Sequence, residues 1–185
     1  MSAPSTNDRK NYIEIGELFF WTATINGWQT LLADDRFKMV IIDSLIYLTE
    51  KNKIEVFAFV IMPNHLHLIW RTVEMNGKET PQASFLKYTA HEFKKLLKAH
   101  ALHLLPNYAV DATNKKFELW RRDSLAIHLN NEKVAYQKLD YIHANPNSGK
   151  WSLCLDPCDY LFSSARFYEE GEKNFSFLKD LRLEF

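Results

Sequence analysis

Residues 54–71 read IEVFAFVIMPNHLHLIWR, a pattern typical of two consecutive strands. The first nine residues, 54–62, are apolar except for Glu55, which predicts a strand buried on both faces. Pro63 and Asn64 interrupt the run, and residues 65–71 continue with an alternating pattern. We therefore expect a hairpin at Pro63, or one long strand that bends there.

Hydrophobic periodicity outward from this stretch predicts the other elements. We expect strands at 17–25 and 117–121, amphipathic helices at 34–51, 84–100 and 132–144, and irregular segments at 72–82 and 101–116. The order strand-helix-strand-strand-helix-strand-helix predicts an α+β fold. The expected architecture is a ferredoxin-like antiparallel sheet with helices packed on one face.

Composition indicates one globular domain over residues 1–185, with a polar N-terminal arm at 1–16 and a charged C-terminal tail at 169–185. The hydrophobic content of 46% excludes a disordered chain. No apolar run approaches the roughly 20 residues that span a bilayer, and the first ten residues are too polar for a secretory signal. With only two cysteines, we expect a cytoplasmic protein without a disulfide framework.

Charge alone does not indicate a partner. Lys plus Arg is 23 and Asp plus Glu is 23, so the formal net charge is zero. Proteins that bind nucleic acid usually carry a basic excess. Nucleic-acid binding by this chain would therefore depend on local clusters of basic residues and on a specific site.

The most informative local pattern is His65-Leu66-His67. Residues i and i+2 of a strand point to the same face, so both imidazoles project together while Leu66 faces the core. Two imidazoles on a rigid strand make half of a metal site. The alternative is a partly exposed histidine pair without a ligand. The apolar strand around them favours function, because buried histidines lose hydration without a return.

A second pattern lies in the helix at 132–144, where Tyr141 and Asn145 are separated by four residues and share a face. A tyrosine beside an amide suggests a nucleophile next to a third metal ligand. The alternatives are an aromatic ring packed on the sheet and a helix-terminal asparagine ahead of Pro146. His143 should face away from Tyr141, so we rank it below Asn145 as a ligand.

Together these motifs, VIMPNHLHLIW at 60–70 and KLDYIHANP at 138–146, closely resemble those of the single-tyrosine HUH transposases. The nearest branch is the REP-associated tyrosine transposases, relatives of insertion-sequence enzymes. The resemblance covers about residues 17–168 and includes FFWTATI, LKYTAHEF, ELWRRD and YLFSSARFYEEG. The chain departs from the family at Asn147, where valine is frequent, and at Arg121, where many relatives have glutamine.

The resemblance implies a metal-dependent transposase that cuts and rejoins single-stranded DNA beside hairpins, as in DNA transposition and recombination. His65, His67 and Asn145 match the ligands of one Mg²⁺ or Mn²⁺ ion, and Tyr141 matches the nucleophile that forms a 5′-phosphotyrosine link. The implied partner is single-stranded or hairpin DNA, with no membrane, in the cytoplasm and nucleoid of a bacterium. Relatives act as monomers or homodimers, so both states remain open.

Lys87, Arg121 and Arg122 lie in segments that resemble the family, and we predict that they contact DNA phosphates. Lys94, Lys95 and Lys98 are interpreted as a solvated helix face. Two other functions stay open: a domesticated hairpin-DNA-binding protein with little catalysis, and a metal-dependent phosphodiesterase. Covalent capture of DNA on Tyr141 would distinguish them, because a hydrolase that uses water leaves no protein adduct.

Overall fold

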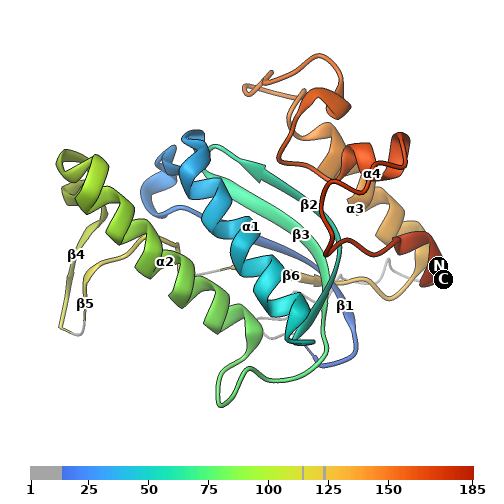
Figure 1. The fold of residues 1–185 in the computed structure, drawn as a ribbon, viewed down its shortest axis with the longest axis horizontal. Coiled ribbons are helices and arrows are strands. Elements are labelled where there is room, and N and C mark those ends of the chain that lie inside the picture. Colours follow the sequence, from blue (N-terminus) through green and yellow to red (C-terminus); the bar gives the residue numbers. More distant parts are fainter. Residues whose placement is uncertain (1–13, 114, 123) are drawn as a thin grey trace, which may run out of the picture.

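The structure, a computed structural model, describes residues 14–113, 115–122 and 124–185 (Figure 1). The expected polar arm at 1–16 therefore lies mostly outside the described residues. A four-stranded antiparallel sheet forms the centre, and its strands, in spatial order, are β2 (Ile54–Met62), β3 (His65–Thr72), β1 (Leu18–Thr24) and β6 (Leu125–His128). This is the strand order of a ferredoxin-like fold, and the predicted α+β class is confirmed.

β2 and β3 form the predicted hairpin, with Met62 paired to His65 across the turn at Pro63 and Asn64. The alternative of a single bent strand is excluded by this pairing. β3 lies between β2 and β1, so the two histidines occupy an inner strand of the sheet. Nearly every residue of β2 is buried, which agrees with its apolar sequence.

The two long helices, α1 (Asp35–Glu50) and α2 (Pro81–His100), pack side by side on one face of the sheet (Figure 1). Asp34 caps α1 by accepting a hydrogen bond from the backbone N–H of Arg36 at 3.0 Å. α2 begins three residues before its predicted start, because Thr80 caps it and Pro81 occupies its first turn. Beneath these helices, the rings of Trp21 and Trp70 stack at 4.8 Å.

The third helix, α3 (Glu132–Ala144), lies against the other face of the sheet. Its buried Leu139 and Ile142 pack in a cluster with Phe20 of β1 and Ile69 of β3. His67 and Ile69 are two residues apart on β3 and share this face. The position of α3 therefore brings its side chains toward the histidines.

Shorter elements join these layers. They are α4 (Ala165–Glu169) and the 3₁₀ helices η1 (Asn26–Trp28), η2 (Leu31–Ala33), η3 (Leu102–Tyr108), η4 (Pro157–Asp159) and η5 (Leu181–Leu183). Within the described ranges, no helix has the length and apolar character needed to cross a membrane.

The prediction of a strand at 117–121 is wrong about the position of that strand. β5 (Lys115–Phe117) ends where that strand should begin, and it pairs with β4 (Ala109–Ala112) in a separate hairpin beside α2 (Figure 1). Trp120 makes only an isolated bridge to Ile25. The fourth strand of the main sheet is β6, whose four residues pair with β1. Such a short segment shows too little alternation to be recognised without its partner strand.

The segment 169–185 is packed rather than a free charged tail. Leu178 forms a parallel bridge with Val56, and the N–H of Lys179 donates to the carbonyl of Val56 at 2.9 Å. The ring of Phe177 is buried against Phe59. The apolar residues among its charges explain this packing, because they bury surface on the outer edge of β2.

Candidate active site

His65 and His67 project from the same face of β3, as strand geometry predicts. Their ring centroids lie 4.7 Å apart. Leu66, between them, is fully buried in the core on the α1 and α2 side. Antiparallel pairing sets Thr24 opposite His65 and Thr22 opposite His67. The histidines thus lie near the end of β1 and the start of β3.

The residue before the pair fixes the tautomer of His65. Asn64 donates through its amide nitrogen to the carbonyl of Trp28 at 3.3 Å, which leaves its amide oxygen facing His65. That oxygen lies 2.6 Å from Nδ1 of His65. Because a carbonyl oxygen only accepts, Nδ1 carries the proton and Nε2 keeps its lone pair. A ligand histidine is commonly held in this way.

His67 is held by the neighbouring strand. Its Nδ1 lies 2.7 Å from the hydroxyl of Thr22. Its Nε2 is buried and, among the described residues, has no hydrogen-bond partner. A buried nitrogen without a hydrogen-bond partner lowers the stability of the fold, so we expect this atom to bind a ligand. With Nδ1 donating to Thr22, the Nε2 lone pair is free to bind one.

Both imidazoles are neutral at physiological pH. Burial lowers the pKa of His65 to about 4, against a smaller opposing effect of a hydrogen bond with Asn145. Burial also lowers the pKa of His67 to about 3, with further lowering by His65 and by the positive charge of Lys138. Neutral imidazole is the form that binds a metal ion.

Tyr141 comes to the histidines from α3. Its ring lies 5.2 Å from the ring of His67 and 6.0 Å from that of Phe20, and the side chain stays about half exposed. The Nζ of Lys138 lies one turn earlier on α3, 5.7 Å from the Tyr141 ring and 4.8 Å from the Phe20 ring. The tyrosine is therefore open to a substrate and has a positive charge beside it.

The side chains of Asn145 and His143 point in different directions, as the helix periodicity predicts. Asn145 follows α3 as its C-terminal cap, is buried, and interacts through its side chain with His65. His143 turns away from the pair, and its Nε2 lies 2.9 Å from the hydroxyl of Ser164. Burial lowers the pKa of His143 to about 4. Of these two residues, Asn145 is therefore the one whose side chain reaches the histidine pair on β3.

These side chains fit one divalent cation. The described residues contain no group of three or more His, Cys, Asp or Glu side chains that could hold a metal ion, so the histidine pair and the Asn145 amide are the candidate donors. A structural zinc site would need four protein ligands. Two imidazoles and one amide oxygen suit an ion that keeps open positions for water or a phosphate oxygen. The unpartnered Nε2 of His67 is the observation that supports this fit.

The surroundings of the histidines are basic and aromatic. Lys138 and Lys150 are the cations that act on the histidine pKa values, and the Trp151 ring lies 6.4 Å from the His65 ring. Such an environment suits an anionic substrate.

The residues predicted to contact DNA lie on two segments: Arg121 and Arg122 follow Trp120, and Lys87 lies on α2. Arg121 donates its backbone N–H to the carbonyl of Thr24, and its guanidinium lies 5.2 Å over the exposed Trp28 ring, next to the histidines. Arg122 pairs with Glu118 at 3.0 Å. Lys87, on α2, pairs with Glu79 of the preceding loop at 2.7 Å, on the opposite face of the sheet.

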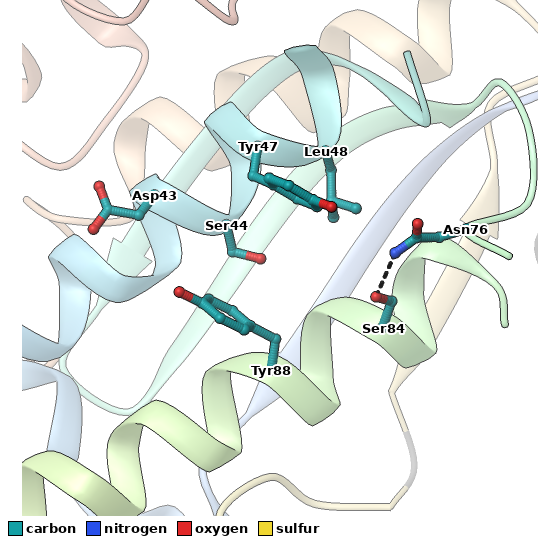
Figure 2. Close-up of a pocket in the computed structure, with 7 residues that line it drawn as sticks. All are labelled: Asp43, Ser44, Tyr47, Leu48, Asn76, Ser84 and Tyr88. Atoms are coloured by element: carbon teal, nitrogen blue, oxygen red, sulfur yellow. Dashed lines mark hydrogen bonds between the residues drawn. The ribbon is translucent and has the colours of Figure 1, made fainter. Parts of the chain in front are cut away.

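A cavity of about 460 Å³ lies between α1 and α2, on the opposite face of the sheet from His67 (Figure 2). Ser44 and Tyr47 from α1 and Tyr88 from α2 project into it, and Asn76 donates to the Ser84 hydroxyl at 2.7 Å. None of the described residues that line it is a histidine or a lysine that would pair with a metal ion or a phosphate. The histidine pair is therefore a better candidate for the site than this cavity.

Three residues of the candidate site were not predicted from the sequence: Thr22, Asn64 and Lys138. Asn64 directly precedes the histidine pair, and Lys138 lies three residues before Tyr141, so both could be found from spacing alone. Thr22 is different, because its pairing with His67 depends on the register of β1 against β3.

Comparison with known proteins supports the fold. No family model matches the sequence, and no curated protein matches it. A solved REP-associated tyrosine transposase bound to a REP hairpin aligns with 98% of this chain and 93% of its own, at 19% sequence identity and a TM-score of 0.60. A Deinococcus radiodurans R1 protein described as a candidate transposase aligns with 74% of this chain and 95% of its own, at 16% identity and a TM-score of 0.44. The first likeness establishes that this chain has the fold of the REP-associated tyrosine transposase, in agreement with its two motifs.

Proposed function

We propose that this protein is a metal-dependent single-stranded DNA endonuclease and strand transferase of the transposase class, which acts beside DNA hairpins. The observation that carries the proposal is the meeting of Tyr141 with His65 and His67, which come from distant parts of the sequence. The hairpin-bound structural neighbour supports DNA as the partner.

In this proposal the side chains divide the work. The Tyr141 oxygen attacks the scissile phosphorus, a new oxygen–phosphorus bond forms, and the bond to the 3′ oxygen breaks. The tyrosine hydroxyl loses its proton, and the departing 3′ oxygen ends as a hydroxyl. Lys138 places a positive charge beside the phosphate. The reverse attack by a 3′-hydroxyl rejoins DNA without hydrolysis.

His65, His67 and Asn145 would hold the divalent cation, Mg²⁺ or Mn²⁺. When bound, it would polarise the phosphate and stabilise charge on the leaving oxygen. Thr22 and Asn64 hold the two imidazoles in the orientation and tautomer that this role needs.

Trp28 and Arg121 would hold a base of the single strand at the edge of the site. Trp28 is 57% exposed and adopts a φ of 57°, a left-handed conformation that costs a bulky residue about 1–2 kcal/mol. Its carbonyl binds the Asn64 amide that also holds His65, so the ring stands next to the candidate ligands. An exposed indole under a guanidinium is a platform for base stacking.

The proposal is tested by incubating the purified protein with end-labelled hairpin DNA and Mn²⁺, with wild type beside Tyr141→Phe. The substrate should come from DNA that flanks the gene. We expect a labelled protein band on a denaturing gel that needs both the metal and Tyr141. Tyr141→Phe removes one hydroxyl and little volume, so hairpin binding should stay nearly unchanged.

The other outcomes identify the alternatives. Cleavage that survives Tyr141→Phe would contradict the tyrosine nucleophile and favour a phosphodiesterase that uses water. Binding of the flanking hairpin without cleavage or adduct would contradict catalysis and favour a domesticated binding protein. Loss of binding in Tyr141→Phe would mean that the tyrosine is structural.

A further inference from the structure

A basic groove is lined by residues of α2 and of the β4–β5 hairpin. The hairpin lies near α2 at one end of the molecule (Figure 1). The cavity of the groove is about 640 Å³. Among the described residues, its lining has four lysines, one histidine, no Asp or Glu, and otherwise small or apolar residues: Lys87, Ala90, His91, Lys94, Ala112, Thr113, Lys115, Lys116, Phe117 and Leu119. In a chain with a net charge of zero, this is a strong local excess of positive charge.

The lysines stand on both walls of the groove. On α2, Lys87, His91 and Lys94 are separated by four and three residues and form one stripe along the helix. At about 1.5 Å per residue, Lys87 and Lys94 are about 10 Å apart along the helix axis. The hairpin wall carries Lys115 and Lys116. A polyanion in the groove would therefore meet positive charge on two sides.

These charges are available to a ligand. Lys87 and Lys115 pair with Glu79 and Glu118, but partly exposed ion pairs contribute only about 0–1 kcal/mol and exchange readily for phosphate. Lys94 lies 5.3 Å over the ring of Phe117. Across the described ranges, neither Lys94 nor Lys116 forms an ion pair with a carboxylate.

The aromatic content of the groove indicates which kind of nucleic acid it suits. Single strands are held by exposed rings on which bases stack. Among the described residues that line the groove, the only aromatic one is Phe117, and its side chain is half-buried, unlike the exposed ring of Trp28, so the groove offers little ring surface for stacking. Lysines without stacking rings recognise the phosphate backbone, which a duplex presents on its outside.

Backbone hydrogen bonds connect the groove to the candidate active site. The carbonyl of Leu119, on the groove wall, accepts from the N–H of Asn26 at 2.8 Å. The next residue back, Ile25, donates to the carbonyl of Asn64 at 2.8 Å, and Asn64 adjoins His65. The groove and the histidines are therefore anchored to the same end of the sheet.

We propose that this basic groove holds the phosphate backbone of the duplex stem of a DNA hairpin, while the adjoining single strand reaches the histidine pair. The proposal rests on the proposed function, since it assigns the place of the stem in the same DNA substrate. Its contacts are to phosphate only, so they are independent of sequence, and any stable hairpin can serve as the probe.

The test compares Lys94→Gln/Lys116→Gln with the control Lys95→Gln/Lys98→Gln, which loses the same charge at α2 positions outside the groove. Binding of a fluorescent DNA hairpin, and of a single strand with the composition of its flank, is measured by anisotropy at several salt concentrations. For the hairpin we expect the groove variant to lose affinity roughly tenfold and its salt slope to fall by about 0.9 per lost phosphate contact. The control and Lys94→Arg/Lys116→Arg should bind like wild type.

Equal weakening by the groove and control variants would overturn the proposal, because it would show a general charge effect. Weakening of single-strand binding as large as that of hairpin binding would overturn the duplex assignment. If the groove variant binds the hairpin like wild type while wild type forms the Tyr141 adduct, the groove proposal fails and the proposed function stands. If wild type binds no DNA hairpin at all, both fail. Unchanged thermal melting of the variants shows that each has folded.

Discussion

Thr22 and Asn64 each contact one ring nitrogen of a candidate ligand histidine, from two different elements. Asn64 does so within the β2–β3 turn, and Thr22 from the adjacent strand β1. In both cases the contacted atom is Nδ1, which leaves Nε2 for a ligand. The same arrangement at both histidines indicates that the two rings are oriented to bind one shared ligand through Nε2.

Thr22→Val should weaken binding of Mn²⁺ about 10- to 100-fold, since it removes the hydroxyl that orients His67 and keeps the shape of the side chain. Isothermal titration of the purified protein with Mn²⁺ measures the effect. Thr24→Val, on the same strand and face, is the matched control and should bind Mn²⁺ like wild type. Unchanged affinity in Thr22→Val would show that the hydroxyl does not position the ligand.

Trp28→Ala should weaken binding of a single-stranded oligonucleotide by about 1–3 kcal/mol, the typical contribution of one stacked base. Fluorescence anisotropy measures the affinity. Tyr47→Ala is the control, because Tyr47 is exposed to a similar degree but lies on α1, away from the histidines. If both substitutions weaken binding equally, Trp28 has no special role as a stacking platform.

At the scale of elements, α3 determines whether the tyrosine meets the histidines. Its N-terminus is capped by Asn131, whose side chain accepts from the N–H of Val134 at 3.0 Å. Its apolar stripe, with Leu139 and Ile142, is buried against the sheet. Neither feature takes part in chemistry, yet both set the distance between Tyr141 and His67.

Leu139→Ala should lower the free energy of unfolding by about 2–5 kcal/mol, because it leaves a cavity between α3 and the sheet. Urea denaturation measures the change. In the molecules that remain folded, the adduct on Tyr141 should form more slowly, since the helix loses its support. Leu155→Ala, at a fully exposed leucine, should change neither quantity. Normal adduct formation in Leu139→Ala would mean that the position of α3 does not depend on this contact.

Some elements could be predicted from sequence because their cause is local. The common face of His65 and His67 follows from strand periodicity, and the separation of Asn145 from His143 follows from helix periodicity. β6 and the Thr22 contact could not be predicted in this way, because both depend on which strand pairs with β1 and in which register. The packed segment after residue 169 also depends on distant partners on β2.

For the whole molecule, the buried His67 and His143 and the half-buried His65 make stability depend on pH. Burial lowers the pKa of His65 and of His143 to about 4 and that of His67 to about 3, all below the value of 6.5 for an exposed histidine. As pH falls below about 6.5, the unfolded chain takes up protons that the folded chain excludes. Stability is therefore complete above that pH and decreases with acidification.

Between about pH 6.5 and 5, the free energy of unfolding should fall by up to about 1.4 kcal/mol per pH unit for each of these histidines. Urea denaturation at a series of pH values measures the slope. His143→Gln should reduce that slope by up to about 1.4 kcal/mol per pH unit, because it removes one of the three groups that take up a proton on unfolding. A slope that is flat in wild type would contradict the buried, neutral state of the histidines.

One chain supplies every residue of the candidate site, so catalysis should not need a second copy. A mixture of Tyr141→Phe and His67→Gln should therefore form no adduct, since neither chain contains both groups. The labelled protein band of the gel assay is the readout, and each variant alone is the control. Recovered activity in the mixture would show that the tyrosine reaches the histidines of another molecule.

The covered edge of β2 has a consequence for the behaviour of the protein at high concentration. Its carbonyls at Phe59 and Val56 accept from Ser164 and Lys179, and its N–H at Ile61 donates to the carbonyl of Phe162. A nine-residue apolar strand with these groups free would be a template for the same strand of a neighbouring molecule and would start a growing fibre. By occupying that edge, the C-terminal third of the chain protects the protein from polymerising through its own sheet.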